Sequence, residues 1–138
     1  MSEIIEVKSS DLVGLALDWA VGIADGRELE LPSEFRSRTC VVWCDPFVIK
    51  REGYPDFHDK TRRHWKPSIK WENGGPLIEK HMVSLHCPQS TDDVWAGWVI
   101  TEKGEFCQAG DHALIAACRA IVSAKLGDTV QVPKELMP

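Results

Sequence analysis

The sequence predicts an α+β domain in which two helices pack on a small, mainly antiparallel β-sheet. Two segments with helical apolar periodicity, one near each end of the chain, predict the helices. Short apolar and β-branched runs between them predict the strands. With 138 residues, of which 43% are hydrophobic and 27% charged, residues 1–138 have the size and composition of a single globular domain.

The first elements are a short strand and a helix. Residues 4–7 suit a strand, and the polar residues 9–11 can cap a following helix. Gly26 predicts the end of this helix, whereas Gly14 and Gly22 predict close packing of another segment against it. The predicted buried face repeats at intervals of three and four residues and comprises Leu12, Leu15, Ala16, Trp19, Ala20 and Ile23.

The middle of the chain predicts strands separated by turns. Residues 39–43 are β-branched and apolar, and Pro46 is expected to interrupt the strand before residues 47–49. Residues 77–85 and 94–100 are better strand candidates.

Residues 50–76 predict a long irregular loop. They hold six residues that disfavour regular structure, namely Gly53, Pro55, Pro67, Gly74, Gly75 and Pro76. A loop of this length within a compact domain is usually functional or mobile. Residues 50–76 are therefore the segment most expected to hold a functional site.

The second helix has the clearest signals. Asp111 can cap it, Gly127 predicts its end, and a turn at residues 103–104 precedes it. Residues 129–132 suit a last short strand. The apolar stripe of the helix consists of Leu114, Ile115, Cys118, Ile121, Val122 and Leu126.

Charge and cysteine content narrow the functional classes. The net charge of −5 argues against broad, non-specific binding of nucleic acid, which needs a basic surface. Five cysteines without a regular framework suit a reducing compartment. Residues 1–10 lack the pattern of a signal peptide, and no apolar run approaches the ~18 residues of a transmembrane helix. We therefore expect a cytoplasmic protein without a membrane partner.

Basic and aromatic residues alternate in one segment. Residues 58–71 carry a formal charge of +4 and include Trp65 and Trp71. Cations can neutralise phosphates while indole rings stack on bases. Three readings fit this segment: a solvated basic loop with tryptophans anchored in the core, a site for a small anionic or nucleotide ligand, and a site for a nucleic-acid strand. Its basic residues are Lys60, Arg62, Arg63, Lys66 and Lys70.

Metal, cofactor and catalytic motifs are weak. Residues 73–76, Asn-Gly-Gly-Pro, could expose backbone N–H groups to an anion, but they are not a P-loop, and a turn explains them as well. Ser68 and His64 lie four residues apart without a nucleophile elbow around the serine, so no catalytic residue is assigned. No cofactor is expected. The residues that could bind metal are too unevenly spaced for a zinc site: Cys40, Cys44, His58, His64, His81, His86 and Cys87.

Three ordered blocks of sequence carry a family resemblance: residues 12–26, residues 65–79 and residues 114–128. Together they resemble the NinX-like family of small phage and prophage proteins, which is associated with the nin accessory region of lambdoid phages. The resemblance excludes about residues 27–57. It implies a phage origin and a non-essential accessory role, and it implies no particular reaction.

The middle block departs from the family pattern at one point. Pro67, Ser68 and Trp71 match it, and Trp65 stands where family members carry a tyrosine. Residues 69–70, Ile-Lys, replace a threonine–aspartate pair, so that a base stands in place of an acid. Any ligand contact made by that acid in the family is therefore in question here.

We hypothesise a non-enzymatic binder of a nucleotide-like small molecule, such as a host signalling nucleotide. Trp65 and Trp71 would stack on the ligand, and the basic side chains would face its anionic group. The hydroxyl of Ser68 and the backbone at Gly74 and Gly75 would donate hydrogen bonds. The resemblance implies that Asp18 and Trp19 close the site from the first helix, although Trp19 also suits the core. The full predicted site is Arg62, Arg63, Trp65, Lys66, Pro67, Ser68, Trp71, Gly74, Gly75, Glu79, Asp18 and Trp19.

Two rival hypotheses belong to other classes. The first is a module that binds a host protein, with exposed tryptophans as interface anchors. The second is a small hydrolase or transferase that uses His64, Ser68 or Glu79. A homo-oligomer is compatible with each hypothesis, and nucleic acid is the least favoured partner.

Overall fold

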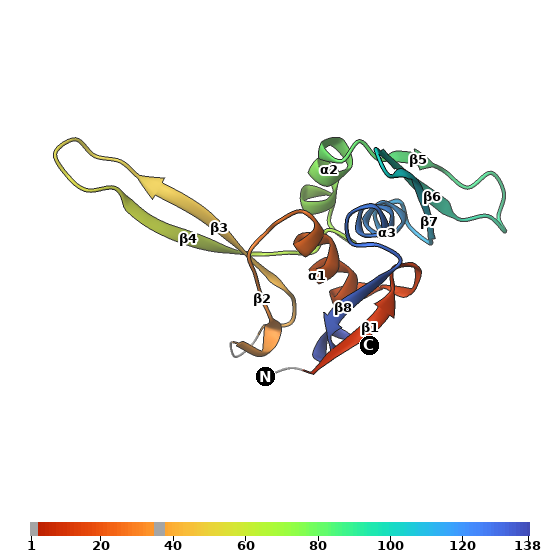
Figure 1. Ribbon diagram of the computed structural model, residues 1–138, viewed down its shortest axis with the longest axis horizontal. Helices are drawn as coiled ribbons and strands as arrows, with labels where there is room; N and C mark the ends of the chain where they lie inside the picture. Colours follow the sequence, from red (N-terminus) through yellow and green to blue (C-terminus); the bar gives the residue numbers. More distant parts are fainter. Residues whose placement is uncertain (1–2, 35–37) are drawn as a thin grey trace.

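The computed structural model describes residues 3–34 and 38–138. Within these residues the chain forms three α-helices and three antiparallel sheets, so the predicted α+β class is confirmed (Figure 1). The helices are α1 (Gly14–Ala24), α2 (Trp71–Lys80) and α3 (Ala113–Leu126). The strands are β1 (Ile4–Lys8), β2 (Leu29–Glu30), β3 (Val42–Ile49), β4 (Phe57–His64), β5 (Ser84–His86), β6 (Trp95–Thr101), β7 (Gly104–Gly110) and β8 (Thr129–Pro133).

Helix α3 is central to the body of the molecule. It packs against α1 and against the β5-β6-β7 sheet, and the β1-β8 pair lies beside α1 (Figure 1). Two sheet glycines allow close contact with α3. A Cβ atom on Gly97 would lie 2.7 Å from the Ala116 oxygen, and one on Gly110 would lie 2.6 Å from the Ala116 nitrogen. The sheet can therefore approach the backbone of α3 because these positions lack side chains.

Strands β3 and β4 form a long hairpin, which we call the arm (residues 42–64) and which projects from the body (Figure 1). The prediction that Pro46 interrupts β3 is wrong. The Cys44 nitrogen donates to the Glu28 oxygen, away from β4. Because backbone groups of alternate residues point to the same side of a strand, the nitrogen of Pro46 also faces away from β4. The missing N–H therefore removes no bond within the hairpin.

The prediction of an irregular loop over residues 50–76 is also wrong. The segment contains β4 and most of α2, and Gly53, with φ of +82°, lies in the loop at the tip of the arm. Gly74 lies inside α2, where a Cβ atom would collide with the Pro67 oxygen and lie 2.7 Å from Leu114 Cδ2. Glycine is needed at position 74 for close packing and not for a positive φ. Pro76 lies within the same helix.

Helix α2 also replaces part of a predicted strand. Residues 77–85 were expected to be extended, but α2 continues to Lys80 and the strand is limited to Ser84–His86. Two helices were predicted, and α2 is a third. Its glycines and proline hid the helical pattern from a reading based on propensity.

The first predicted helix is confirmed with a later start. Residues 9–11 form a short 3₁₀ turn instead of a cap, and α1 begins at Gly14. Close packing is confirmed at Gly22, where a Cβ atom would lie 2.8 Å from Trp65 Nε1. The prediction of close packing is wrong at Gly14, which has φ of +56° and open space around it. Gly14 serves a backbone conformation that other residues rarely adopt.

The C-terminal elements follow the prediction except at one cap. Helix α3 ends at Leu126, before Gly127 with φ of +102°. The predicted cap at Asp111 is wrong, because His112 is the N-cap and contributes no side-chain hydrogen bond. The predicted strands at residues 4–7 and 129–132 are confirmed as β1 and β8, which pair with each other. Across residues 3–34 and 38–138, every helix is too short or too polar to span a bilayer.

The close contact at Gly74 can be tested with a neighbouring glycine as control. We expect Gly74→Ala to destabilise the protein by about 1–3 kcal/mol, because the added methyl group collides with backbone. We expect Gly75→Ala to stabilise it by about 0.5–1 kcal/mol, since its Cβ atom would meet nothing closer than Trp71 Cε3 at 3.9 Å. Urea unfolding of both variants measures the difference. Equal effects would contradict the packing role of Gly74.

Candidate functional site

The turn between β4 and α2, residues 65–70, is fixed to α1 by one residue. Trp65 is only 1% exposed, and its Nε1–H donates to the backbone oxygen of Asp18 at 2.9 Å. The backbone nitrogen of Ser68 donates to Asp18 Oδ1, also at 2.9 Å. Asp18 therefore holds the first and the fourth residue of this short segment. We call this segment the anchored turn.

Asp18 makes these bonds from within the core. Its side chain is 2% exposed. Burial raises the pKa of Asp18 to about 6, while hydrogen bonding from Ser68 and the positive charge of Lys66 oppose the rise. The carboxyl group is thus poised to change protonation in mildly acidic conditions.

Trp65 is also covered on the side that faces the arm. The Arg27 guanidinium lies over the rings of both Trp43 and Trp65, at 4.0 and 4.2 Å from their centroids. Arg27 Nε binds Asp25 Oδ2 at 2.9 Å. Burial acts to raise the pKa of Asp25, but hydrogen bonds from Lys80, His81 and Arg27 outweigh it and lower that pKa. Trp65 is therefore part of the core and is not a face on which a ligand can stack.

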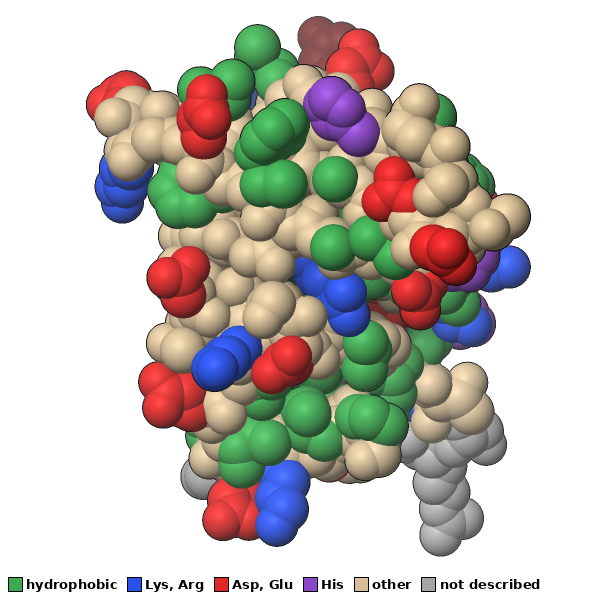
Figure 2. All heavy atoms as spheres, turned by 90° about the vertical axis from the view of Figure 1, so that its right-hand side faces the viewer, with side chains coloured by type: hydrophobic (Ala, Val, Ile, Leu, Met, Phe, Trp, Pro, Cys, Tyr) green, Lys and Arg blue, Asp and Glu red, His purple; other side chains and the backbone are tan. Residues whose placement is uncertain are grey.

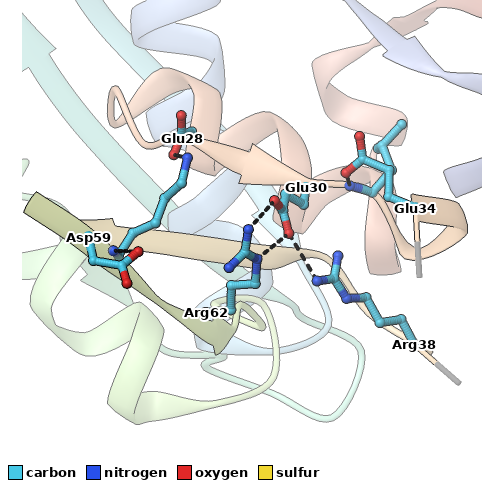
Figure 3. A network of polar contacts seen from close by, with 8 residues as sticks. Glu28, Glu30, Glu34, Arg38, Asp59 and Arg62 are labelled. Carbon is cyan, nitrogen blue, oxygen red and sulfur yellow. Dashed lines mark hydrogen bonds and ion pairs between the residues drawn. The ribbon is translucent and has the colours of Figure 1, made fainter. Parts of the chain in front are cut away.

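The basic residues of the arm are held by acidic residues of the same chain. Arg62 Nε donates to Glu30 Oε1 at 3.0 Å, and Lys60 Nζ donates to Glu28 Oε2 at 2.8 Å (Figure 3). Arg63 Nε contacts Asp45 Oδ2 at 3.0 Å. These ion pairs tie the base of the arm to β2 and across the hairpin. Arg62 and Arg63, with Glu72 and Asn73 of α2, line a separate surface pocket.

The remaining predicted site residues lie in several places. Lys66 is half-buried, and its backbone nitrogen donates to Asn73 Oδ1 at 2.9 Å. Pro67 is buried, with its oxygen against Gly74. Gly75 and the exposed Glu79 lie along α2. Trp19 is half-buried and packs against the core. Ser68 and Trp71 are different, because both line one cavity.

This cavity, which we call the aromatic cavity, has a volume of about 410 Å³. It lies between the anchored turn, the start of α2, the start of β6 and the start of α3. Trp71 is 59% exposed at its wall, and Trp95 is half-buried. A cavity of this size with aromatic walls and a few polar groups is typical of small-molecule sites. Its lining residues are Ser68, Ile69, Trp71, Trp95, His112, Ala113 and Leu114.

The electrostatic character of the aromatic cavity comes from helix ends. Ala113 and Leu114 are the first residues of α3, whose first turn has no side-chain cap and no acidic residue. The N-terminus of a helix carries roughly half a positive charge. Helix α2 also begins at this cavity without a side-chain cap, but Glu72 in its first turn offsets its dipole. The start of α3 is thus the more favourable place for an anion.

The Ser68 hydroxyl is buried in the wall of this cavity. Ser68 is 3% exposed, and its Oγ forms no hydrogen bond with the described residues. It lies near enough to Asp18 to help lower the pKa of that carboxyl. Activation of the serine as a nucleophile would need a histidine or an acid bonded to Oγ. The acid beside Oγ is the buried Asp18 carboxyl, but the two do not meet hydrogen-bond geometry, and Oγ has almost no exposed surface for a substrate to reach.

The thiols and imidazoles do not gather around this cavity. In the part of the chain that the structure describes, His, Cys, Asp and Glu side chains form no group of three suited to a metal ion. Cys118 is buried on α3, and burial raises the pKa of its thiol. This environment is typical of an unreactive core cysteine.

Sequence reasoning missed the half of the cavity that lies far along the chain. Trp95 begins β6, and His112 precedes α3, so neither adjoins the basic segment. The available signal was the start of α3, where the first backbone N–H groups precede the hydrogen-bonded part of the helix. The N-terminus of a helix is a favourable place for an anion, and Trp71 offers an aromatic ring. Together these two features indicate that the start of α3 and Trp71 belong to one site.

Comparison with protein families identifies a relationship that spans most of the chain. The model described as "Bacteriophage P22, NinX" matches residues 8–125, which include α1, the arm, α2 and nearly all of α3. The match therefore covers the anchored turn and the whole lining of the aromatic cavity. A comparison with curated proteins gives no match.

The buried carboxyl of Asp18 predicts a specific pH dependence. Its pKa in the folded protein is about 6, against 3.8 in its ordinary state, so the native state binds a proton more readily than the unfolded state. The resulting stabilisation is fully present below about pH 4 and is lost as pH rises through about 6. Asp18→Asn removes this titration and keeps the Oδ1 acceptor for Ser68.

Urea unfolding at several pH values measures this effect. We expect the free energy of unfolding of the wild type, minus that of Asp18→Asn, to increase by about 2 kcal/mol from pH 7 to pH 4.5. Asp25 is present in both proteins, so its opposite contribution cancels. A difference that stays constant over this range would contradict the raised pKa.

Proposed function

Because the chain belongs to the phage NinX family, whose model matches residues 8–125, we propose that it is a phage accessory protein that binds a small anionic, nucleotide-like ligand. The proposed site is the aromatic cavity. One observation carries the proposal: the exposed ring of Trp71 and the uncapped start of α3 line the same cavity. The planar ring of a ligand would stack on Trp71 while its attached anionic group lies at the start of α3.

Trp71 supplies the stacking face that the sequence suggested for two tryptophans. At 59% exposure its indole leaves much apolar surface in water, which a ligand ring can cover. Stacking of a base on an aromatic side chain contributes about 1–3 kcal/mol. Trp95 and Ile69 extend the apolar wall around it. The second predicted stacking residue, Trp65, contributes by holding the anchored turn in place.

A small ligand fits the charge of the protein better than a nucleic-acid strand does. The net charge is −5, and Lys60, Arg62 and Arg63 of the arm are paired with acids. On the face drawn in Figure 2, the blue Lys and Arg side chains stand apart among red acidic and green apolar ones. A strand needs a continuous basic track along its phosphates.

Binding without catalysis is the simplest function for this geometry. Ser68 is the nucleophilic side chain in the lining, and its Oγ lacks a hydrogen-bonded base among the described residues. His64 ends β4 and Glu79 lies on α2, outside the lining. We therefore propose that the protein holds its ligand, which is consistent with sequestering a host nucleotide.

A second candidate function rests on the arm. It projects from the body and carries exposed apolar side chains near its tip, including Tyr54 at 67% exposure (Figure 1). Phe47, Ile49 and Phe57 lie on one face of the hairpin, as their register shows. Exposed aromatic residues on a projecting element are typical anchors for a protein partner. This observation favours a host protein as the alternative partner.

The ligand proposal predicts different effects for two exposed tryptophans. Trp71→Ala should weaken binding of a nucleotide by about 10-fold or more, because the stacking face is lost. Trp98→Ala is the control, since Trp98 is 39% exposed on β6 and does not line the aromatic cavity. Thermal shift with a panel of mono-, di- and triphosphate and cyclic nucleotides identifies the ligand, and calorimetry measures the affinities. Equal affinities for the two variants would refute the site.

The arm predicts a separate outcome if the function is to bind a host protein. The double variant Phe47→Ser, Phe57→Ser would then lose one defined partner that co-purifies with the wild type at fixed stoichiometry. Trp71→Ala would keep that partner. Light scattering of the purified complexes measures the stoichiometry. Loss of the partner in Trp71→Ala, with retention in the double variant, would assign the interaction to the aromatic cavity instead.

A further inference from the structure

Nothing in the described part of the chain covers the outer part of the arm. Strand β2 pairs with β3 at the base of the arm, at Val42 and Trp43, whereas every residue from 46 to 59 is exposed. These exposed residues, which we call the ribbon, still include paired segments of β3 and β4 that project into solvent (Figure 1). A two-stranded ribbon that packs on nothing is marginally stable in water. A covering partner would therefore stabilise it.

One face of the ribbon is strongly apolar. Ile49 and Phe57 lie opposite each other in the register, and Phe47 lies on the same face, two residues closer to the body. All three side chains are exposed. The other face carries the Val48 and His58 pair between these positions, so it is less apolar. We call the face with Phe47, Ile49 and Phe57 the apolar face.

The edges of the ribbon are unsuited to an added strand. Pro46 offers no N–H on the outer edge of β3. On the outer edge of β4, the Lys60 nitrogen already donates to Asp59 Oδ1 at 2.8 Å. Proline and charged residues on an edge discourage pairing with a strand of another chain. We therefore expect a partner to pack on the apolar face, as one sheet packs on another.

The charge of the arm permits contact with a second copy of the chain. Residues 42–64 contain five lysine and arginine residues and four aspartate and glutamate residues, a formal charge of +1, whereas the whole chain carries −5. Two acidic bodies repel each other at short range. Two arms that overlap in opposite directions keep the bodies at the far ends of the assembly, so a contact through the arms avoids this repulsion.

A twofold axis that crosses the ribbon at Ile49 and Phe57 brings opposite charges together. Such an axis lays the apolar face of one arm on that of the other, with the two tips pointing in opposite directions. Asp59 lies two residues from Phe57 towards the body, and Arg51 lies two residues from Ile49 towards the tip. Arg51 of one copy therefore comes within reach of Asp59 of the other, and the contact occurs twice. Among the described residues, the ion pairs of the arm involve neither of these two side chains.

The size of the apolar face sets the strength of the contact. Side chains of this size bury about 150–250 Å² each when fully covered, so three that are roughly half-exposed contribute on the order of 300 Å² per copy. A standard interface buries about 800 Å² per partner. The expected dimer is therefore weak and reversible, with a Kd in roughly the micromolar range.

From these features we infer that the arm is a homodimerisation element, in which two copies of the chain pack their apolar faces around a twofold axis at Ile49 and Phe57. The inference goes beyond the proposed function, because it concerns the arm and not the aromatic cavity. It assigns a second copy of this chain to the surface that the alternative function assigns to a host protein.

Sedimentation equilibrium of the purified protein, from about 1 to 500 μM, covers the Kd expected for an interface of this size. We expect the average mass to rise from that of one chain towards that of two. Ile49→Asp places two carboxylates at the axis and should raise the Kd by about 10-fold or more. Val48→Asp is the matched control, because Val48 is 45% exposed against 46% for Ile49 but lies on the other face. It should dimerise like the wild type.

A charge exchange tests whether the partner is a second copy. Arg51→Glu and Asp59→Arg should each raise the Kd by about 5-fold or more, since the twofold axis repeats each change at two contacts. The double variant Arg51→Glu, Asp59→Arg should recover the affinity of the wild type. Recovery within one chain requires that position 51 of one copy meets position 59 of another. Circular dichroism confirms that each variant is folded.

Three results would overturn the inference. The mass of a single chain at the highest concentration would show that two arms do not associate, and would leave the apolar face to a different protein. A dimer that survives Ile49→Asp, or that Val48→Asp weakens equally, would place the contact elsewhere. A double charge variant that stays as weak as its parents would exclude the proposed twofold arrangement. Trp71→Ala is expected to dimerise normally, so the outcome does not depend on nucleotide binding.

Discussion

The structure depends on two hydrogen bonds that converge on Asp18. The indole N–H of Trp65 reaches the backbone oxygen of Asp18, and the Ser68 nitrogen reaches its carboxylate. A turn of six residues joins the projecting hairpin to a short helix. These bonds, with the large ring of Trp65 in the core, give it one conformation. The position of everything that follows, from Ser68 to the start of α2, is set by this attachment to α1.

This attachment explains why a buried carboxyl group, which lowers stability at neutral pH, stands at position 18. A buried carboxyl group destabilises the folded protein at neutral pH, and an apolar residue at position 18 would avoid that cost. It would also release the Ser68 nitrogen and leave a buried donor unpaired. Gly22 and Gly74 serve the same end, since one admits the Trp65 ring against α1 and the other admits α2 against Pro67 and Leu114. Core packing and the shape of the aromatic cavity thus follow from the same few residues.

The sequence predicts those elements in which periodicity and end signals agree. The stripe that begins at Leu114 and the glycine after it predict α3, and the apolar periodicity from Leu15 predicts α1. The predicted faces are wrong at their ends, because Leu12 precedes α1 and both Ile23 and Leu126 are exposed. Prediction fails where glycine or proline serves tertiary packing: Gly74 and Pro76 lie within α2, and Pro46 lies within β3. The sequence predicts only part of the lining of the aromatic cavity. Ser68 and Trp71 follow from local pattern, whereas Trp95 and His112 join them only through the fold. Trp65, Arg62 and Arg63 look like ligand contacts in the sequence because their partners Asp18, Glu30 and Asp45 are distant along the chain or across a hairpin.

The six tryptophans allow the central claim to be tested in one spectrum. A ¹⁵N-correlation NMR spectrum resolves each indole N–H and the backbone amides of α3, and can be recorded with and without a saturating concentration of the nucleotide that gives the largest thermal shift. If the anchored turn shapes a ligand site at the start of α3, the indole signals of Trp71 and Trp95 and the amides of residues 113–114 shift. The Trp65 indole stays in place because its bond to Asp18 is part of the framework. Shifts confined to the arm, or a displaced Trp65 signal with an unchanged Trp71, would contradict the account.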